Sequence, residues 1–158
     1  MAIRSACAGD AARLTEVAHA AKRHWGYPEE LIERWRADLT VTEDFIAEHP
    51  IGVAVDGADV VGFYALSNEG ETFELEHLWV EPLRMRAGIG AELFAHALET
   101  VRSRGGSKLE IASDPNAEGF YRRMGARRLG TIPSQPEGRT LPLLVCWLEP
   151  LADVPEQT

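Results

Sequence analysis

The stretch from Phe73 to Val101 constrains the fold of this chain most, because its pattern changes from strand to helix within a few residues. Its first half alternates as in a β-strand, with Phe73, Leu75, His77 and Trp79 on one side and Glu74, Glu76, Leu78 and Val80 on the other. Pro82 ends this strand, because proline has no N–H to donate to a sheet. The second half has the spacing of one helical face, at Ile89, Leu93, Phe94, Ala97, Leu98 and Val101.

The loop between strand and helix leads into two glycines, Gly88 and Gly90, at the first turn of the predicted helix. Inside a helix each glycine costs about 1 kcal/mol relative to alanine, so the bare backbone serves another purpose. Free N–H groups, the positive end of the helix dipole and the neighbouring Arg84 and Arg86 together predict an anion-binding site. A pyrophosphate group fits such a site.

These residues resemble the signature of the GNAT-type N-acetyltransferases, in which a strand, V-x-P, a Gln/Arg-x-x-Gly-x-Gly/Ala turn and a helix follow in this order. The matching residues are Val80-Glu81-Pro82 and Met85-Arg86-Ala87-Gly88-Ile89-Gly90. Met85 departs from the pattern, because the family usually has Gln or Arg there. Since the turn holds phosphate mainly through backbone N–H groups, we expect Met85 to be tolerated, with Arg84 or Arg86 replacing the lost contact.

A second motif lies about 30 residues further on, a separation that one helix and one strand require. It is similar to the family's second signature, an Asn followed by Phe-Tyr and then a Gly that ends a helix. The corresponding residues here are Asn116, Phe120, Tyr121 and Gly125. Two motifs in the right order are more specific than one glycine turn, and the resemblance extends from Ile3 to about Leu148.

The rest of the sequence predicts strands and helices around these motifs. Asp10 and Pro28 mark the beginnings of two helices, as an N-cap and as a first-turn residue, and Gly26 ends the first of them. Short helices are predicted at 42–48 and 116–124. A right-handed crossover makes the strand ending at Val80 parallel to the next one in the chain. The other predicted strands cover 2–5, 51–55, 60–67, 108–112, 129–132 and 141–148.

We therefore predict an α/β (α+β) fold: a mixed, mostly antiparallel central sheet with one parallel, splayed strand pair flanked by helices. This is the acyl-CoA N-acyltransferase fold that the resemblance implies. We expect a single domain over 1–150 and a polar C-terminal tail over 151–158.

Composition excludes several classes of function. With 45% apolar and 26% charged residues the chain is of the soluble globular type, and its net charge of −9 argues against nucleic acid as a partner. Because no apolar run approaches the roughly 18 residues of a membrane span and no signal-peptide core is present, we predict a cytoplasmic protein without a membrane partner. Cys7 and Cys146 have no neighbours at metal-binding spacing, so neither a disulfide nor a metal site is predicted.

The resemblance implies that acetyl-CoA is bound and that an amine attacks its thioester directly, in a ternary complex. It places the pyrophosphate on Met85 to Ala91 and the pantetheine along the strand that ends at Val80. Asn116 is expected to bond the pantetheine or to cap its own helix. The predicted cofactor-binding residues are Leu78, Trp79, Val80, Met85, Arg86, Ala87, Gly88, Ile89, Gly90, Ala91, Asn116, Phe120 and Tyr121.

This chemistry requires a neutral amine, a donor to the carbonyl oxygen and a proton for the leaving thiolate. Glu74 and Glu76 are the candidate general bases, although both also fit solvated residues on an exposed strand face. His77 faces the opposite side and is expected to be a packed structural residue. Tyr121 matches the tyrosine that the family often aims at the sulfur, or it packs beside Phe120. A strand N–H near Leu78 or Val80 is the candidate donor to the oxygen.

The acceptor wall in this family is formed by helices between the first two strands. Here that segment contains the aromatic elbow His24, Trp25 and Tyr27, which we predict to bind the substrate; the alternative is core packing at a helix junction. The acceptor is a small-molecule amine or a peptide amine, and the sequence does not choose between them. Homodimers are common in the family, so a homodimer is expected to be possible.

Two other functions were weighed. A dinucleotide-binding oxidoreductase needs G-x-G-x-x-G directly after its first strand, and a nucleotide phosphohydrolase needs G-K-[ST]; the chain has neither. A non-catalytic acyl-CoA-binding sensor stays open, because its cofactor turn would be identical and only the catalytic Glu and Tyr would be idle.

Overall fold

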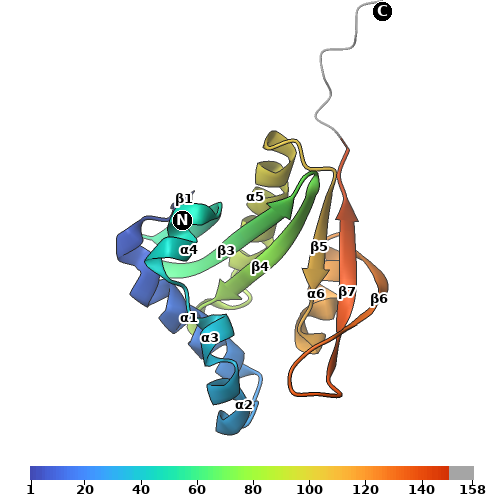
Figure 1. The fold of residues 1–158 in the computed structure, drawn as a ribbon. Coiled ribbons are helices and arrows are strands. Elements are labelled where there is room, and N and C mark those ends of the chain that lie inside the picture. The colour runs from blue at the N-terminus through green and yellow to red at the C-terminus, as the bar shows by residue number, and fades with distance from the viewer. Residues whose placement is uncertain (150–158) are drawn as a thin grey trace, which may run out of the picture. The chain divides into compact units, whose positions relative to one another are not determined.

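The computed structural model describes residues 1–149 (Figure 1), and the predicted tail at 151–158 lies outside the described residues. Its helices are α1 (Ala11–His24), α2 (Glu29–Arg34), α3 (Arg36–Leu39), α4 (Glu43–Glu48), α5 (Ile89–Ser103) and α6 (Glu118–Arg123). Its strands are β1 (Ala2–Ser5), β2 (Ile51–Asp56), β3 (Asp59–Glu69), β4 (Thr72–Val80), β5 (Lys108–Ala112), β6 (Arg127–Pro133) and β7 (Thr140–Trp147).

The strands form a mixed sheet in the order β1-β2-β3-β4-β5-β7-β6. Pairing is antiparallel for β1–β2, β2–β3, β5–β7 and β6–β7, and parallel for β4–β5, where Thr72–Glu74 lie opposite Lys108–Glu110. The predicted fold class is therefore confirmed. The position of β7 between β5 and β6 could not be inferred from the order of the strands along the chain.

The described residues form two compact units, and each is treated by itself. The first unit comprises Met1–Leu66 and Glu76–Ala97. The second comprises Ser67–Leu75 and the described residues from Leu98 onward. None of the helices in the described part of the chain has the length and apolar character needed to cross a membrane.

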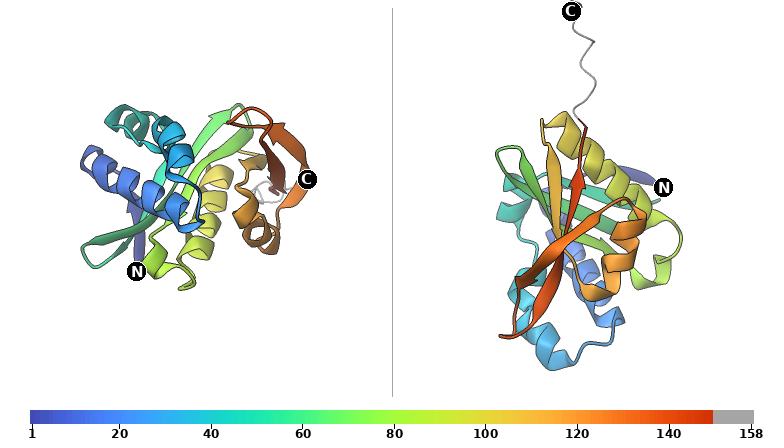
Figure 2. Two further views of the ribbon diagram at one scale, coloured as in Figure 1. Left: turned by 90° about the horizontal axis from the view of Figure 1, so that it is seen from below. Right: turned by 90° about the vertical axis from the view of Figure 1, so that its right-hand side faces the viewer.

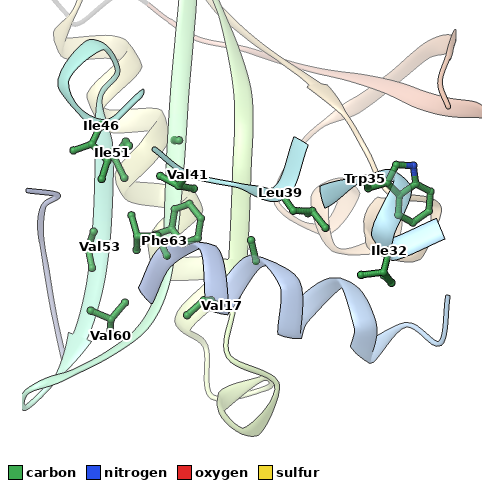
Figure 3. Close-up of a cluster of buried hydrophobic side chains, with 13 residues drawn as sticks. Val17, Ile32, Trp35, Leu39, Val41, Ile46, Ile51, Val53, Val60 and Phe63 are labelled. Carbon is green, nitrogen blue, oxygen red and sulfur yellow. The ribbon is translucent and has the colours of Figure 1, made fainter. Parts of the chain in front are cut away.

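The core of the first unit lies between the N-terminal helices and the sheet (Figure 3). Leu14 and Val17 of α1 belong to one buried cluster with Val53 of β2 and Phe63 of β3. The next residue of β3, Tyr64, bonds instead to His96 of α5, with 2.7 Å between its hydroxyl oxygen and the His96 Nδ1. Because successive side chains of a strand point to opposite faces, α1 and the beginning of α5 cover opposite faces of β3 (Figure 2).

Gly62 lets β3 and β4 approach closely in the first unit. A Cβ at this position would lie 2.8 Å from the Trp79 carbonyl oxygen and 3.0 Å from the Leu93 Cδ1. The Glu81 N–H donates to the Val61 carbonyl over 2.8 Å, which fixes the end of β4 against β3. Gly62 therefore sets the position of the strand end that carries Trp79 and Val80.

The second unit has its own buried core of Phe73, Val101, Leu109, Ile111 and Leu144. Gly106, just beyond α5, is packed so tightly that a Cβ there would lie 2.4 Å from the Val101 Cγ1 and 2.7 Å from the Phe73 Cδ1. In this way β4, the end of α5 and β5 are held together at their common edge.

Two predicted helix starts are corrected. Asp10 precedes α1 but does not cap it, because its carboxylate accepts from the Cys7 N–H over 2.8 Å and pairs with Arg4 over 2.8 Å. Pro28 is the residue before α2 and not part of its first turn, and the helix breaks again at Trp35. By contrast Thr42 caps α4 as its sequence predicts, with its hydroxyl accepting from the Phe45 N–H over 3.0 Å.

Candidate active site

The turn at Met85–Ala91 belongs to the first unit and follows β4 through a 3-10 helix at Pro82–Arg84. Arg86 has a φ of 71° and Gly88 a φ of 81°, so two residues of the turn adopt the left-handed conformation. The Gly88 carbonyl accepts from the Glu92 N–H over 3.1 Å, which makes Gly88 the residue before the first turn of α5. The N–H groups of Ile89, Gly90 and Ala91 thus belong to the helix start, where no intrahelical acceptor exists.

The charges beside this turn are not equivalent. Arg84 bonds to Asp56 of the β2–β3 turn over 2.6 Å, so its guanidinium is directed away from the expected role of replacing the Met85 contact. The exposed Arg86 side chain makes no ion pair or hydrogen bond within residues 1–149. Arg86 is therefore the better placed of the two for an anion.

The turn fits a diphosphate. Backbone N–H groups at a helix start, a glycine required by its φ and an uncommitted guanidinium form a donor set suited to anionic oxygens. A Cβ on Gly88 would meet no atom within 4 Å, so the conformation and not the lack of space requires glycine.

The end of β4 holds a buried histidine in the first unit. His77 lies between the rings of Phe45 and Phe63, with centroids 5.7 and 5.6 Å away. The Trp79 Nε1–H donates to the His77 Nδ1 over 2.9 Å. Burial, with a smaller contribution from His49, lowers the pKa of His77 to about 4, so the ring is neutral at pH 7. His77 is the packed structural residue that the strand pattern predicts.

The two candidate bases lie on β4 but in different units. Glu76 belongs to the first unit and Glu74 to the second, and both side chains are exposed. Exposure fits a carboxylate that takes a proton through water and fits a solvated strand residue equally well. Leu78, Trp79 and Val80, which follow them, are half-buried.

The aromatic elbow follows α1 in the first unit. His24 and Trp25 are both exposed, Trp25 by 40%, and their rings meet edge to face with centroids 5.2 Å apart. Tyr27 is half-buried and packs edge to face on Trp35, with centroids 5.0 Å apart. Of the three predicted substrate residues, His24 and Trp25 thus face solvent and Tyr27 is partly core.

Sequence analysis missed Lys22. Its Nζ lies 4.8 Å from the ring centroid of Tyr27, 4.5 Å from that of Trp35 and 5.9 Å from that of Trp79. The only available signal was a lysine on the apolar side of α1, beside Ala21 and three residues before Trp25. The partners come from distant parts of the chain, so spacing alone does not identify them.

The second unit holds Asn116, Phe120 and Tyr121. The predicted cap role of Asn116 is wrong, because the Asp114 Oδ1 accepts from both the backbone N–H and the side-chain Nδ2 of Asn116 over 2.9 Å. Asp114 caps the 3-10 helix at Pro115–Ala117, and Ala117 precedes α6. Gly125, with a φ of 103°, ends this helical segment as predicted.

Tyr121 is 7% exposed and lies against Phe120, with ring centroids 5.3 Å apart. Burial, and then the charge of Asp114, raise the pKa of the Tyr121 hydroxyl above its ordinary value. Tyr121 therefore carries its proton at neutral pH and can donate a hydrogen bond. Packing beside Phe120 and this donor role are both compatible with the arrangement.

Comparison with known proteins gives one family throughout. The model of the acetyltransferase (GNAT) domain matches residues 26–135. The chain is 33% identical over 116 residues to the peptidyl-lysine N-acetyltransferase YjaB of Salmonella typhimurium, covering 72% of this chain and 76% of that protein.

Solved structures agree in fold. The PaiA N-acetyltransferase of Thermoplasma acidophilum in complex with coenzyme A aligns with a TM-score of 0.76 at 20% identity, over 93% of this chain and 98% of that one. An aminoglycoside 6'-N-acetyltransferase complexed with coenzyme A aligns with a TM-score of 0.71 at 19% identity, over 97% and 100%. The chain belongs to the GNAT acetyltransferase family, and it is an N-acetyltransferase with acetyl-CoA as its acetyl donor.

Proposed function

We propose that the protein transfers the acetyl group directly to a primary amine while donor and acceptor are bound together, and that the acceptor is a basic small molecule or peptide. The turn at Met85–Ala91 carries this proposal, because it offers N–H donors to a diphosphate directly after β4. The net charge of −9 favours a basic acceptor. The names of the relatives, a peptidyl-lysine enzyme and an aminoglycoside enzyme, point the same way.

The residues of the turn and of β4 would hold the donor. Gly88, Ile89, Gly90 and Ala91 donate backbone N–H groups to the diphosphate, and Arg86 adds a positive charge. The backbone from Leu78 to Val80 pairs with the pantetheine amides as an added strand would. Met85, Ala87, Asn116 and Phe120 complete the predicted contacts. Acetyl-CoA supplies a thioester carbonyl that an amine can attack and a thiolate that can leave.

Three groups of this chain would serve the transfer. Glu74 or Glu76 takes a proton from the acceptor ammonium through water, while the buried, weakly basic His77 does not compete for that role. A backbone N–H near Leu78 or Val80 donates to the thioester oxygen. Tyr121, which keeps its proton at neutral pH, donates to the leaving sulfur.

The test is a thiol-release assay with acetyl-CoA and a panel of amines, followed by mass spectrometry of the products. We expect release that depends on the amine, with an acetylated product of matching mass. Amine-independent hydrolysis would contradict direct transfer. Binding of acetyl-CoA without release by any amine would favour the sensor instead.

The two candidate bases are separated by Glu74→Gln and Glu76→Gln in the same assay. The general base should lower turnover by about 10²-fold or more at neutral pH, and part of the loss should be recovered at higher pH, where the free amine is more abundant. If neither variant loses turnover, both glutamates are solvated strand residues. A homodimer and a cytoplasmic location stay predictions of the sequence.

A further inference from the structure

Lys22 is a buried cation surrounded by aromatic rings. It lies in the last turn of α1 and is 8% exposed. Its Nζ is within 5.9 Å of the centroids of Tyr27, Trp35 and Trp79. A distance of up to about 6 Å is the range in which an ammonium is attracted to the face of a ring. We call Lys22 and these three rings the ammonium cage.

The ammonium cage joins four segments of the first unit. Lys22 comes from α1, Tyr27 from the elbow, Trp35 from the break between α2 and α3, and Trp79 from the end of β4. Trp79 is itself held by its hydrogen bond to His77, and its carbonyl lies against Gly62. The cage is therefore anchored to the sheet at one end and to the helical elbow at the other.

A buried ammonium requires compensation, because it gives up hydration when the chain folds. An apolar side chain at this site would avoid that cost and would suffice for packing. The cation adds a directional attraction to each ring, so it fixes the three rings relative to one another. Lys22 and Lys108 are the two lysines of the chain, against fourteen arginines, so this position is not one of many surface lysines.

We infer that Lys22 is a positioning residue for acetyl transfer: its ammonium holds the elbow at Tyr27 against Trp79, and so fixes the acceptor wall relative to the end of β4. This inference rests on the proposed function, in which the elbow binds the acceptor and the backbone of Leu78–Val80 holds the donor. Lys22 touches neither reacting group in this account.

The first test measures the elbow itself and needs no acceptor. In Lys22→Met, which keeps an unbranched side chain and removes the charge, we expect faster amide hydrogen–deuterium exchange in peptides covering 26–31 and 78–83. Peptides of the second unit should be unchanged. Lys22→Arg, which keeps a cation able to stack on rings, should restore slow exchange. Unchanged exchange at the elbow in a folded Lys22→Met would overturn the inference.

Lys108 offers a matched control in the second unit. Its Nζ lies 5.2 Å from the Trp147 centroid and 3.2 Å from Glu110, on a ring that is 63% exposed. Lys108→Met removes the same charge from another aromatic contact and should leave elbow exchange and acetyl transfer unchanged. If Lys22→Met does not fold, Lys22→Gln takes its place, because it is also neutral and keeps a polar end.

The second test uses an amine that supports transfer in the panel. Lys22→Met should raise the acceptor KM roughly tenfold, leave the acetyl-CoA Kd within about twofold, and lower kcat less than it raises KM. Lys22→Arg should recover most of the acceptor affinity. An acceptor KM equal to that of the wild type would overturn the inference. If no amine supports transfer, the proposed function has failed, and the exchange experiment alone decides on the cage.

Discussion

The turn before α5 and the ammonium cage belong to the same unit but are built in opposite ways. The turn depends on backbone conformation, with left-handed residues at Arg86 and Gly88 and free N–H groups at the start of α5. The cage depends on side chains that reach one ammonium from four segments. A backbone site is written locally in the sequence, whereas a side-chain site becomes visible only when distant segments meet.

The largest expected effect comes from a single hydroxyl. Tyr121→Phe should lower kcat about 10³-fold, equivalent to about 4 kcal/mol of barrier, because the leaving sulfur loses its donor. The acetyl-CoA Kd should change little, since the ring still packs beside Phe120. Steady-state kinetics and calorimetry measure the two quantities. Equal turnover in both proteins would remove Tyr121 from the mechanism and leave it a packing residue.

The next effect concerns the pH dependence of the stability of the first unit, through His77. Its pKa is about 4 in the folded protein and 6.5 when unfolded, so between these values the unfolded chain binds more protons. Stability should therefore fall as pH drops from about 6.5 to 4, by about 3 kcal/mol for this residue. His19, whose pKa burial also lowers, adds in the same direction. Urea titrations at several pH values measure the change.

His77→Gln isolates the share of His77, because a neutral side chain cannot titrate and can still accept from Trp79. This variant should lose most of the acid slope between pH 6.5 and 4. Asp10 does not interfere, since Arg4 holds its pKa at about 2 and its contribution is lost only below about pH 3.8. A slope that is the same in both proteins would show that His77 is not the source.

A smaller effect separates conformation from packing in the turn. Gly88→Ala should weaken acetyl-CoA binding roughly tenfold, because a φ of 81° costs an L-residue about 1–2 kcal/mol and the turn relaxes. Gly105→Ala is the matched control: it has the same φ and the same open surroundings, but it lies beyond the other end of α5. The control should lose stability without losing affinity. Equal losses of affinity in both variants would refute a specific role for the turn.

The smallest effect is expected at Met85, the residue that departs from the family pattern. Met85→Gln should change the acetyl-CoA Kd by less than about threefold, because a solvent-accessible hydrogen bond contributes about 0.5 kcal/mol. Calorimetry under the same conditions as for Gly88→Ala gives a direct comparison. A gain of tenfold or more would show that side chains, and not the backbone, dominate this turn.

The sequence predicted the features that short stretches decide by themselves. The hairpin of β2 and β3, the Thr42 cap and the strand–turn–helix at β4 and α5 each depend on neighbouring residues. Asp10 and Asn116 were assigned caps that the structure gives to other groups, because several polar side chains compete for the same N–H groups.

The sequence could not predict the features that need tertiary contacts. The ammonium cage spans Lys22 to Trp79, and the place of β7 between β5 and β6 depends on pairing over a long stretch of chain. The choice between Glu74 and Glu76 is open for a different reason, since two exposed carboxylates on one strand differ too little in their surroundings.

The central claim is that backbone N–H groups at the start of α5 bind the diphosphate of the donor. A crystal structure of the protein with coenzyme A tests it most directly. We predict phosphate oxygens within about 2.7–3.2 Å of N–H groups in the range Gly88 to Ala91. A diphosphate bound elsewhere on the protein, with this turn empty, would contradict the account.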